Sequence, residues 1–235
     1  MQWPFFMSPL DIGLFLRSAR TDAAIVRLRN QHGGRAAFEA VYQAEQDPWR
    51  SASLRYSYQR RKYDTIVEAL PRRPFRHALD LGCGLGLLSQ RLAARADSTL
   101  GLDVAGTAIE LARTRARGID TLSFAQADLM ELPRDLDGRF DLVLIADTLY
   151  YLSPMNDTLL KALVGRIADL LVPGGICVLA NHFFFSADRD SRLSRRIHDA
   201  FSWSPQFSVL SNRRRPFFLT TVLERSAASD VLTQA

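Results

Sequence analysis

The sequence predicts an α/β domain in which a mostly parallel sheet is closed at one edge by an antiparallel pair of strands. Three observations predict it. Short apolar runs alternate with helical segments from residue 78 onward, a glycine-rich turn follows the first run, and two β-rich runs without a helix between them come near the end of the chain. Strands that alternate with helices of this length are typical of parallel sheets with right-handed crossovers.

The predicted strands are short and apolar, and they cover residues 78–81, 99–102, 122–125, 140–146 and 176–180. Helical spacing predicts helices between them over 87–96, 105–117 and 159–171. Residues 140–146 are apolar at almost every position, as in a central parallel strand covered on both faces. The last two runs, 207–211 and 217–223, are predicted to pair across a connection at 212–216 and to form the antiparallel edge.

Residues 1–40 are predicted to form a helical arm or extension before the main domain, which covers residues 41–235. Apolar side chains at three- and four-residue spacing predict helices over 36–43 and 58–70, and Pro71 and Pro74 end the second helix. The role of the arm stays open between a lid, a tail and a contact that forms a homodimer.

The composition is that of a globular protein. Of 235 residues, 47% are hydrophobic and 23% charged, which excludes a disordered tail, a fibre and a low-complexity array. Only Lys62 and Lys161 among the 30 basic residues are lysines, and the arginines form short, scattered runs. A nucleic-acid binder concentrates charge on one stripe with interleaved aromatics, so no nucleic-acid partner is predicted. An anionic or membrane-surface acceptor remains an alternative use of the arginines.

Cys83 and Cys177 lie far apart in apolar stretches, without the spacing of a disulfide framework or a zinc site. They predict reduced thiols in a cytoplasmic protein and no bound metal. The first 16 residues are apolar but lack a basic start, are interrupted by prolines and Asp11, and are too short to cross a bilayer. No transmembrane segment is therefore predicted.

The glycine-rich turn, Gly82, Gly84 and Gly86, follows a strand and opens a helix. Glycines allow the backbone to approach a ligand closely, and the helix start offers free N–H groups. A dinucleotide site would place its third glycine at position 87, so this spacing disfavours NAD. Asp80, two residues before the turn, would repel a pyrophosphate but suits an ammonium group. The pattern therefore favours a nucleoside that carries an amino acid.

Two more aspartates follow successive strands. Asp103 ends the second strand, where a carboxylate can accept both ribose hydroxyls. Asp128 follows the third strand and can accept from an adenine amino group. Each alone could serve as a turn or helix cap. Three aspartates at successive strand ends beside a glycine turn favour a binding site.

With these motifs, residues 60–225 resemble the class I S-adenosylmethionine-dependent methyltransferases. The segment LDLGCGLG (residues 79–86), the aspartates and the turn LVPGG (residues 171–175) match that superfamily. The resemblance implies a Rossmann-like, mostly parallel seven-stranded sheet with a C-terminal antiparallel hairpin, and S-adenosylmethionine as cofactor. It implies that the cofactor is bound by Trp49, Arg60, Asp80, Gly82, Cys83, Gly84, Gly86, Asp103, Val104, Asp128, Leu129 and Ala146.

Four further segments are similar to nodulation protein S and its relatives: DPW (47–49), RRKY (60–63), DTLYYL (147–152) and His182. That family is best known for N-methylation of the de-N-acetylated amino sugar at the end of a chitooligosaccharide. The resemblance implies an amine acceptor, with Asp147, Tyr150 and His182 as catalytic residues and Tyr151 and His182 against the acceptor. This chain departs from the family at Asp147, where a glutamate is expected.

Each of these residues also has an ordinary structural interpretation. Asp147 could cap the segment that follows it, one of the two tyrosines could pack in the core, Trp49 could be core, and Arg60 could lie on the surface. His198, on an expected helix, is predicted to be a surface residue.

Several functions stay open at this point. The favoured one is an S-adenosylmethionine-dependent methyltransferase that acts on a small molecule or glycan. The first choice of acceptor atom is the nitrogen of an amino sugar. The acceptor could also be anionic or linked to a lipid. A hydroxyl acceptor is the near alternative. A catalytically inactive partner subunit is disfavoured by the complete set of glycines and aspartates. An RNA methyltransferase is disfavoured by the scattered arginines.

Overall fold

The structure is a computed structural model that describes residues 8–152, 154–184 and 188–227. Its core is a seven-stranded sheet with strand order β3-β2-β1-β4-β5-β7-β6. The strands are β1 (Phe75–Leu81), β2 (Ala96–Asp103), β3 (Leu122–Gln126), β4 (Phe140–Ala146), β5 (Leu171–His182), β6 (Phe207–Arg215) and β7 (Phe218–Arg225). Strands β1 to β5 pair in parallel, and β7 runs antiparallel between β5 and β6. The predicted Rossmann-like sheet with an antiparallel edge is confirmed.

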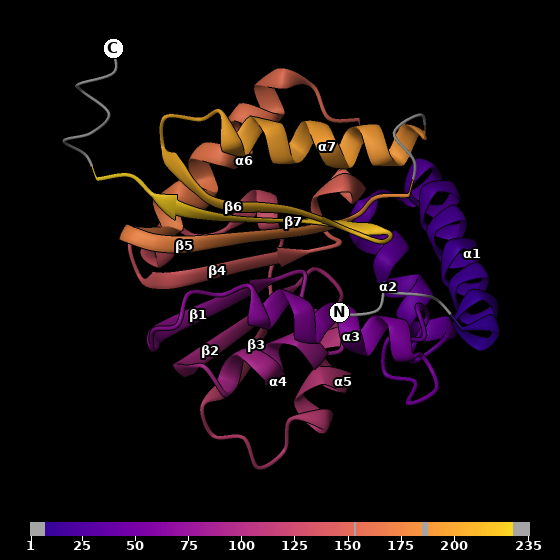
Figure 1. Ribbon diagram of the computed structural model, residues 1–235. Coiled ribbons are helices and arrows are strands. Elements are labelled where there is room, and N and C mark those ends of the chain that lie inside the picture. Colours follow the sequence, from indigo (N-terminus) through magenta and orange to yellow (C-terminus); the bar gives the residue numbers. More distant parts are fainter. Residues whose placement is uncertain (1–7, 153, 185–187, 228–235) are drawn as a thin grey trace.

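Helices cover both faces of this sheet (Figure 1). One face carries α6 (Asp157–Leu170) and α7 (Arg189–Ser202), and the other carries α3 (Ser57–Glu68), α4 (Leu87–Ala93) and α5 (Gly106–Arg115). In β4, Val143 and Ile145 enter the first layer of core while Leu142 and Leu144 enter the second. The apolar run was therefore correctly predicted as a central strand covered on both sides.

The N-terminal part forms two helices, α1 (Pro9–His32) and α2 (Gly34–Ala44), which pack against each other. Both lie at the end of the sheet where the parallel strands finish, on the right of Figure 1. Ser8 caps α1: its side-chain oxygen accepts from the Asp11 N–H, and its own N–H donates to the Asp11 carboxylate. Met1–Met7 lie outside the described residues. The division of the chain at residue 40 stays a proposal; that position lies inside α2.

Two predicted connections are strands in the structure. Strand β5 begins at Leu171 rather than at residue 176, because Leu171 pairs with Phe140 and a register shift then accommodates the proline and glycines before Ile176. Strand β6 continues to Arg215, so the connection is at Pro216 and Phe217 rather than at 212–216. The sequence signal failed there because β6 is an edge strand, where arginine heads reach solvent from both faces.

No helix in the described ranges combines the length and the apolar character that a bilayer crossing needs.

His198 is buried rather than on the surface, which corrects the sequence expectation. Its ring lies between α7, β5 and β7, with Nδ1 2.6 Å from Thr221 Oγ1 and Nε2 3.0 Å from Asn181 Oδ1. Burial, together with the nearby Arg195 charge, lowers the pKa of His198 to about 3. The ring is therefore a neutral bridge between the last helix and the sheet.

This burial predicts a stability loss in mild acid. Because the unfolded chain binds the proton near pH 6.5 and the folded chain does not, each pH unit between about 6 and 4 should cost about 1.4 kcal/mol from this group. Urea unfolding of the wild type and of His198→Gln, which cannot be protonated, measures it. The variant should show the flatter dependence over this range; parallel pH curves would contradict the assignment.

Candidate functional site

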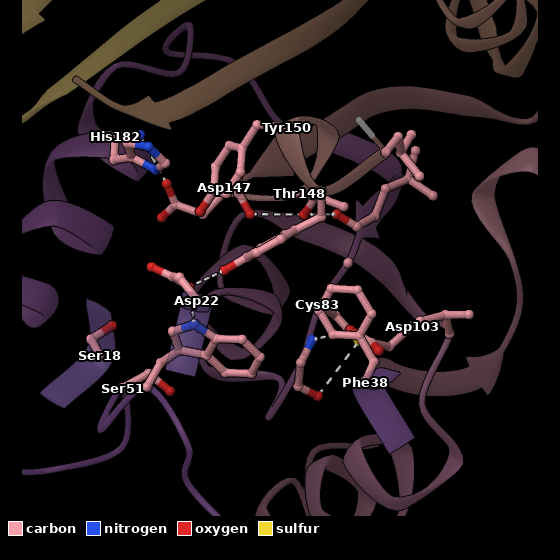
Figure 2. Close-up of a pocket in the computed structure, with 18 of the residues that line it drawn as sticks. Ser18, Asp22, Phe38, Ser51, Cys83, Asp103, Asp147, Thr148, Tyr150 and His182 are labelled. Atoms are coloured by element: carbon pink, nitrogen blue, oxygen red, sulfur yellow. Dashed lines mark hydrogen bonds between the residues drawn. The ribbon is translucent and has the colours of Figure 1, made fainter. Parts of the chain in front are cut away.

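One cavity of about 970 Å³ lies at the carboxyl ends of the parallel strands. Its lining comes from the glycine turn after β1, the segments after β2, β3, β4 and β5, and helices α1, α2, α3 and α7. Figure 2 shows part of this lining, with side chains from distant segments pointing toward a common space. Open α/β sheets bind their ligands at this edge.

The glycine turn is shaped for close approach. Gly82, Gly84 and Gly86 have φ angles of 75°, 51° and 72°, a region that favours glycine. A Cβ at Gly84 would stand 2.8 Å from Tyr42 Oη, and one at Gly86 would collide with Phe124. Gly82, Cys83 and Gly84 line the cavity, whereas Gly86 packs behind it.

Asp103 holds this turn in place. One carboxylate oxygen accepts from the Gly84 N–H at 2.9 Å, and the other accepts from the Ala105 N–H at 3.0 Å. Burial raises the pKa of Asp103. The residue also lines the cavity, as do Val104, Asp128, Leu129 and Ala146. The structure therefore brings together most of the predicted cofactor residues at one end of the cavity.

Asp128 combines the two roles considered for it. Its Oδ1 accepts from the Met130 N–H at 2.9 Å, which caps a short 3₁₀ helix, η1 (Leu129–Glu131). It lines the cavity at the same time.

Asp80 lines the cavity beside the glycine turn. Its side chain is almost fully buried, and Oδ2 accepts from Ser89 Oγ at 2.6 Å. Burial raises the pKa of Asp80 to about 7, more than the Ser89 hydrogen bond lowers it. A buried carboxyl group with this pKa gains from a cationic ligand, which would favour its ionised form.

Of the two predicted cofactor residues Trp49 and Arg60, only Trp49 is in the described cavity lining. Trp49 lines the cavity, and its Nε1 donates to Asp22 Oδ1 at 2.7 Å. Arg60 is not among the described lining residues, because its guanidinium turns to the backbone carbonyls of Ser53 and Leu54. The structure therefore does not bring Arg60, which the resemblance implied as a cofactor-binding residue, to the cavity.

At the other end of the cavity, Asp147 follows β4 with a φ of 52°. Its Oδ2 forms an ion pair with the buried Lys62 of α3, and its Oδ1 accepts from the His182 N–H at 3.0 Å. The Asp147 N–H donates to the Ala180 carbonyl at 2.8 Å. Asp147 therefore lines the cavity and also ties the ends of β4 and β5 to α3.

Tyr150, Tyr151 and His182 form an aromatic cluster at the same end of the cavity as Asp147. The rings of Tyr150 and His182 lie 4.3 Å apart, and those of Tyr150 and Tyr151 lie 4.5 Å apart. Burial raises the pKa of both tyrosines well above the usual value, so both are neutral phenols. Tyr151 Oη donates to Asp22 Oδ1 at 2.5 Å (Figure 2). All three predicted acceptor-side residues line the cavity.

Sequence analysis missed Asp22 and Lys62. Asp22 lies on α1, in the region expected to be an arm, and Lys62 is the last of three consecutive basic residues on α3. The available signal was indirect: a lysine in a chain that uses arginine almost throughout, and an acidic residue in a helix rich in arginine.

Comparison with known proteins agrees with this geometry. Residues 78–175 match the sequence model of a family described as a methyltransferase domain. The chain is 28% identical to nodulation protein S of Rhizobium tropici over 155 residues, which cover 66% of this chain and 60% of the relative. It is 27% identical to the nodulation protein S of Sinorhizobium fredii, with 67% and 68% covered. The match thus spans less than two thirds of the first relative's length.

Solved structures give the same fold. The N-methyltransferase NodS of Bradyrhizobium japonicum, in complex with S-adenosylhomocysteine, superposes with a TM-score of 0.66 at 19% identity and covers 80% of this chain and 99% of that one. A putative methyltransferase from Pseudomonas syringae superposes with a TM-score of 0.59 at 25% identity, covering 72% and 99%.

The Lys62–Asp147 ion pair predicts a double-mutant result. Lys62→Met removes the cation but leaves the carboxylate half-buried, so the free energy of unfolding should fall by about 3 kcal/mol. Lys62→Met combined with Asp147→Asn should recover at least half of that loss, because the amide oxygen keeps the hydrogen bond from the His182 N–H. Chemical denaturation of the two single variants and the double variant measures the coupling; strict additivity would show that the pair contributes nothing.

Proposed function

We propose that this chain, a class I S-adenosylmethionine-dependent methyltransferase similar to nodulation protein S, transfers the methyl group to the amine of an amino sugar or oligosaccharide. The observation that carries the choice of an amine is the arrangement at the acceptor end of the cavity. Two carboxylates (Asp22 and Asp147), the imidazole of His182 and the neutral phenols of Tyr150 and Tyr151 line it together. An amine acceptor arrives as a cation and must lose a proton, and these groups suit both steps.

The cofactor is S-adenosylmethionine, and the residues present fit it. Gly82 and Gly84 bring the backbone directly to the cavity in a left-handed conformation that a residue with a side chain rarely adopts. Asp80 is a buried carboxyl group in the same lining, without a cation partner among the described residues. We assign Asp103 and Asp128 to the ribose and adenine, and Asp80 to the ammonium group of the amino-acid part. Val104, Leu129 and Ala146 would line the nucleoside, and Trp49 would close over it.

When bound, S-adenosylmethionine would supply a methyl carbon on a positively charged sulfur: the N–C bond would form in line as the S–C bond breaks, and the sulfur would leave as a neutral thioether. The residues of this chain align the acceptor nitrogen, exclude water and receive its proton. His182 and Tyr150 stand against each other at the acceptor end, and His182 is half-buried, so its imidazole can take the proton from the nitrogen. Asp147 holds the backbone of His182 and thereby the position of its ring.

The cavity also has a basic border on the acceptor side. Arg29, Arg35, Arg189, Arg192 and Arg196 line it. Arg195 and Arg213 are not in the lining: the Arg195 guanidinium stacks 5.1 Å from the centre of the Phe183 ring, and Arg213 is exposed on β6. We therefore propose that an anionic or lipid-linked acceptor would place its negative charge between α1 and α7.

A hydroxyl or carboxylate acceptor is the second candidate. Among the relatives is the trans-aconitate 2-methyltransferase of Deinococcus radiodurans, 34% identical over 116 residues that cover 48% of this chain and 42% of that protein. The arginine border would suit such an anion.

Methyl transfer to defined acceptors tests the proposed function. Labelled methyl from S-adenosylmethionine should appear on a chitooligosaccharide with one free amine and not on its fully N-acetylated counterpart, and His182→Ala should lower kcat by about 10²-fold. Label on both sugars would favour a hydroxyl acceptor. Label on neither would reject the amino-sugar assignment.

The raised pKa of Asp80 makes a separate prediction about the cofactor end. Because the free protein holds the Asp80 proton below about pH 7 and an ammonium group requires the carboxylate, binding releases a proton. The affinity for S-adenosylhomocysteine should therefore rise by up to about tenfold per pH unit from about pH 5.5 to 7 and then level off. Calorimetry of the wild type and Asp80→Asn measures this; the variant should bind weakly and without that slope, and an equal slope would contradict the assignment.

A further inference from the structure

Asp22 is a carboxylate of the cavity that pairs with no lysine or arginine among the described residues. Its Oδ1 accepts two hydrogen bonds, from Trp49 Nε1 at 2.7 Å and from Tyr151 Oη at 2.5 Å. In the described part of the chain it takes part in no ion pair, and its second oxygen has no hydrogen-bond partner. Figure 2 shows Asp22 on the same side of the drawn lining as Asp147 and His182.

Asp147, the other carboxylate at this end, is already neutralised. Lys62 pairs with one oxygen and the His182 N–H donates to the other. An incoming ammonium group would have to compete with a buried lysine for Asp147. Asp22 offers an oxygen without that competition.

The surroundings of Asp22 also suit a cation. The rings of Trp49 and Tyr151 lie 6.3 Å apart and those of Phe38 and Tyr151 lie 5.1 Å apart, and all three residues line the cavity with Asp22. Aromatic faces attract ammonium groups, more strongly where water is excluded. Burial raises the pKa of Asp22, more than the hydrogen bonds from Tyr151 and Trp49 and the neighbouring His182 lower it, and the Asp147 charge raises it further.

Helix α1 holds Asp22 firmly in this place. One residue before it, Thr21 Oγ1 donates to the Pro48 carbonyl at 2.7 Å, and two turns later the Arg29 guanidinium donates to the Tyr151 carbonyl. Both contacts join α1 to the same two segments that supply Trp49 and Tyr151. The donors fix Oδ1, so the free oxygen has a defined direction.

We propose that Asp22 is the acceptor-binding residue that receives the ammonium group of the substrate, and that helix α1 thereby selects amines over hydroxyl acceptors. This inference rests on the proposed amine acceptor. It assigns acceptor choice to a helix that lies outside residues 78–175, the part matched by the family.

Binding calorimetry on the full chain in the presence of S-adenosylhomocysteine tests it. The probes are a chitobiose with one free amine and its di-N-acetylated counterpart, at about pH 6.5, where a sugar amine is protonated. The wild type should bind the free-amine sugar at least tenfold more tightly. Asp22→Asn keeps an acceptor for Trp49 and Tyr151 but removes the charge, and should reduce this preference to less than threefold.

Two further variants separate charge from folding. Asp22→Glu should keep most of the preference, and Asp120→Asn, which removes an exposed carboxylate far from the cavity lining, should match the wild type. The affinity of Asp22→Asn for S-adenosylhomocysteine should stay within about twofold of the wild type. A loss of that affinity would assign Asp22 to the cofactor end and overturn the inference.

The outcomes also separate this inference from the proposed function. Tight binding of the free-amine sugar by both the wild type and Asp22→Asn would overturn the role of Asp22 and leave the amine acceptor standing. Equal binding of both sugars by the wild type, or binding of neither, would overturn both.

Discussion

The ion pair between Lys62 and Asp147 organises the acceptor end of the site. Asp147 adopts a backbone conformation with φ of 52° directly after the central strand β4, and such a conformation is costly for a residue with a side chain. Its carboxylate compensates by bonding to α3 through Lys62 and to β5 through the His182 N–H. The carboxylate thereby joins α3 and β5 to the end of β4, next to the positions of Tyr150 and His182.

At the cofactor end, too, single aspartates both hold the backbone and line the cavity. The two carboxylate oxygens of Asp103 accept hydrogen bonds from the backbone N–H groups of Gly84 and Ala105, which sets the shape of the glycine turn. Each oxygen retains a lone pair for a ligand, so one residue can both build the turn and contact a ribose. The same holds for Asp128, which caps a 3₁₀ helix and lines the cavity. The capping and binding interpretations of these aspartates are compatible.

The parts of the site that the sequence predicts are those written in local patterns. Strand, glycine turn and following aspartate occur at fixed spacing, so Gly82, Asp80 and Asp103 could be found from the residues alone. Asp22 and Lys62 could not, since their importance arises from contacts with residues 85 and 129 positions away along the chain. The predicted end of strand β6 was wrong for another reason. An edge strand has no buried face to impose alternation, and three arginines in a row resemble a loop.

The two acidic residues at the acceptor end illustrate how environment separates the roles of identical groups. Asp147 faces a buried lysine, so its charge is satisfied within the fold and it serves to position its neighbours. Asp22 faces two neutral donors and aromatic rings, so its charge is satisfied only when a ligand brings a cation. A fold that placed the lysine beside Asp22 would leave Asp147 strained and uncompensated, and would close the open oxygen to the substrate. The position of Lys62 on α3 therefore determines which of the two carboxylates is free for recognition.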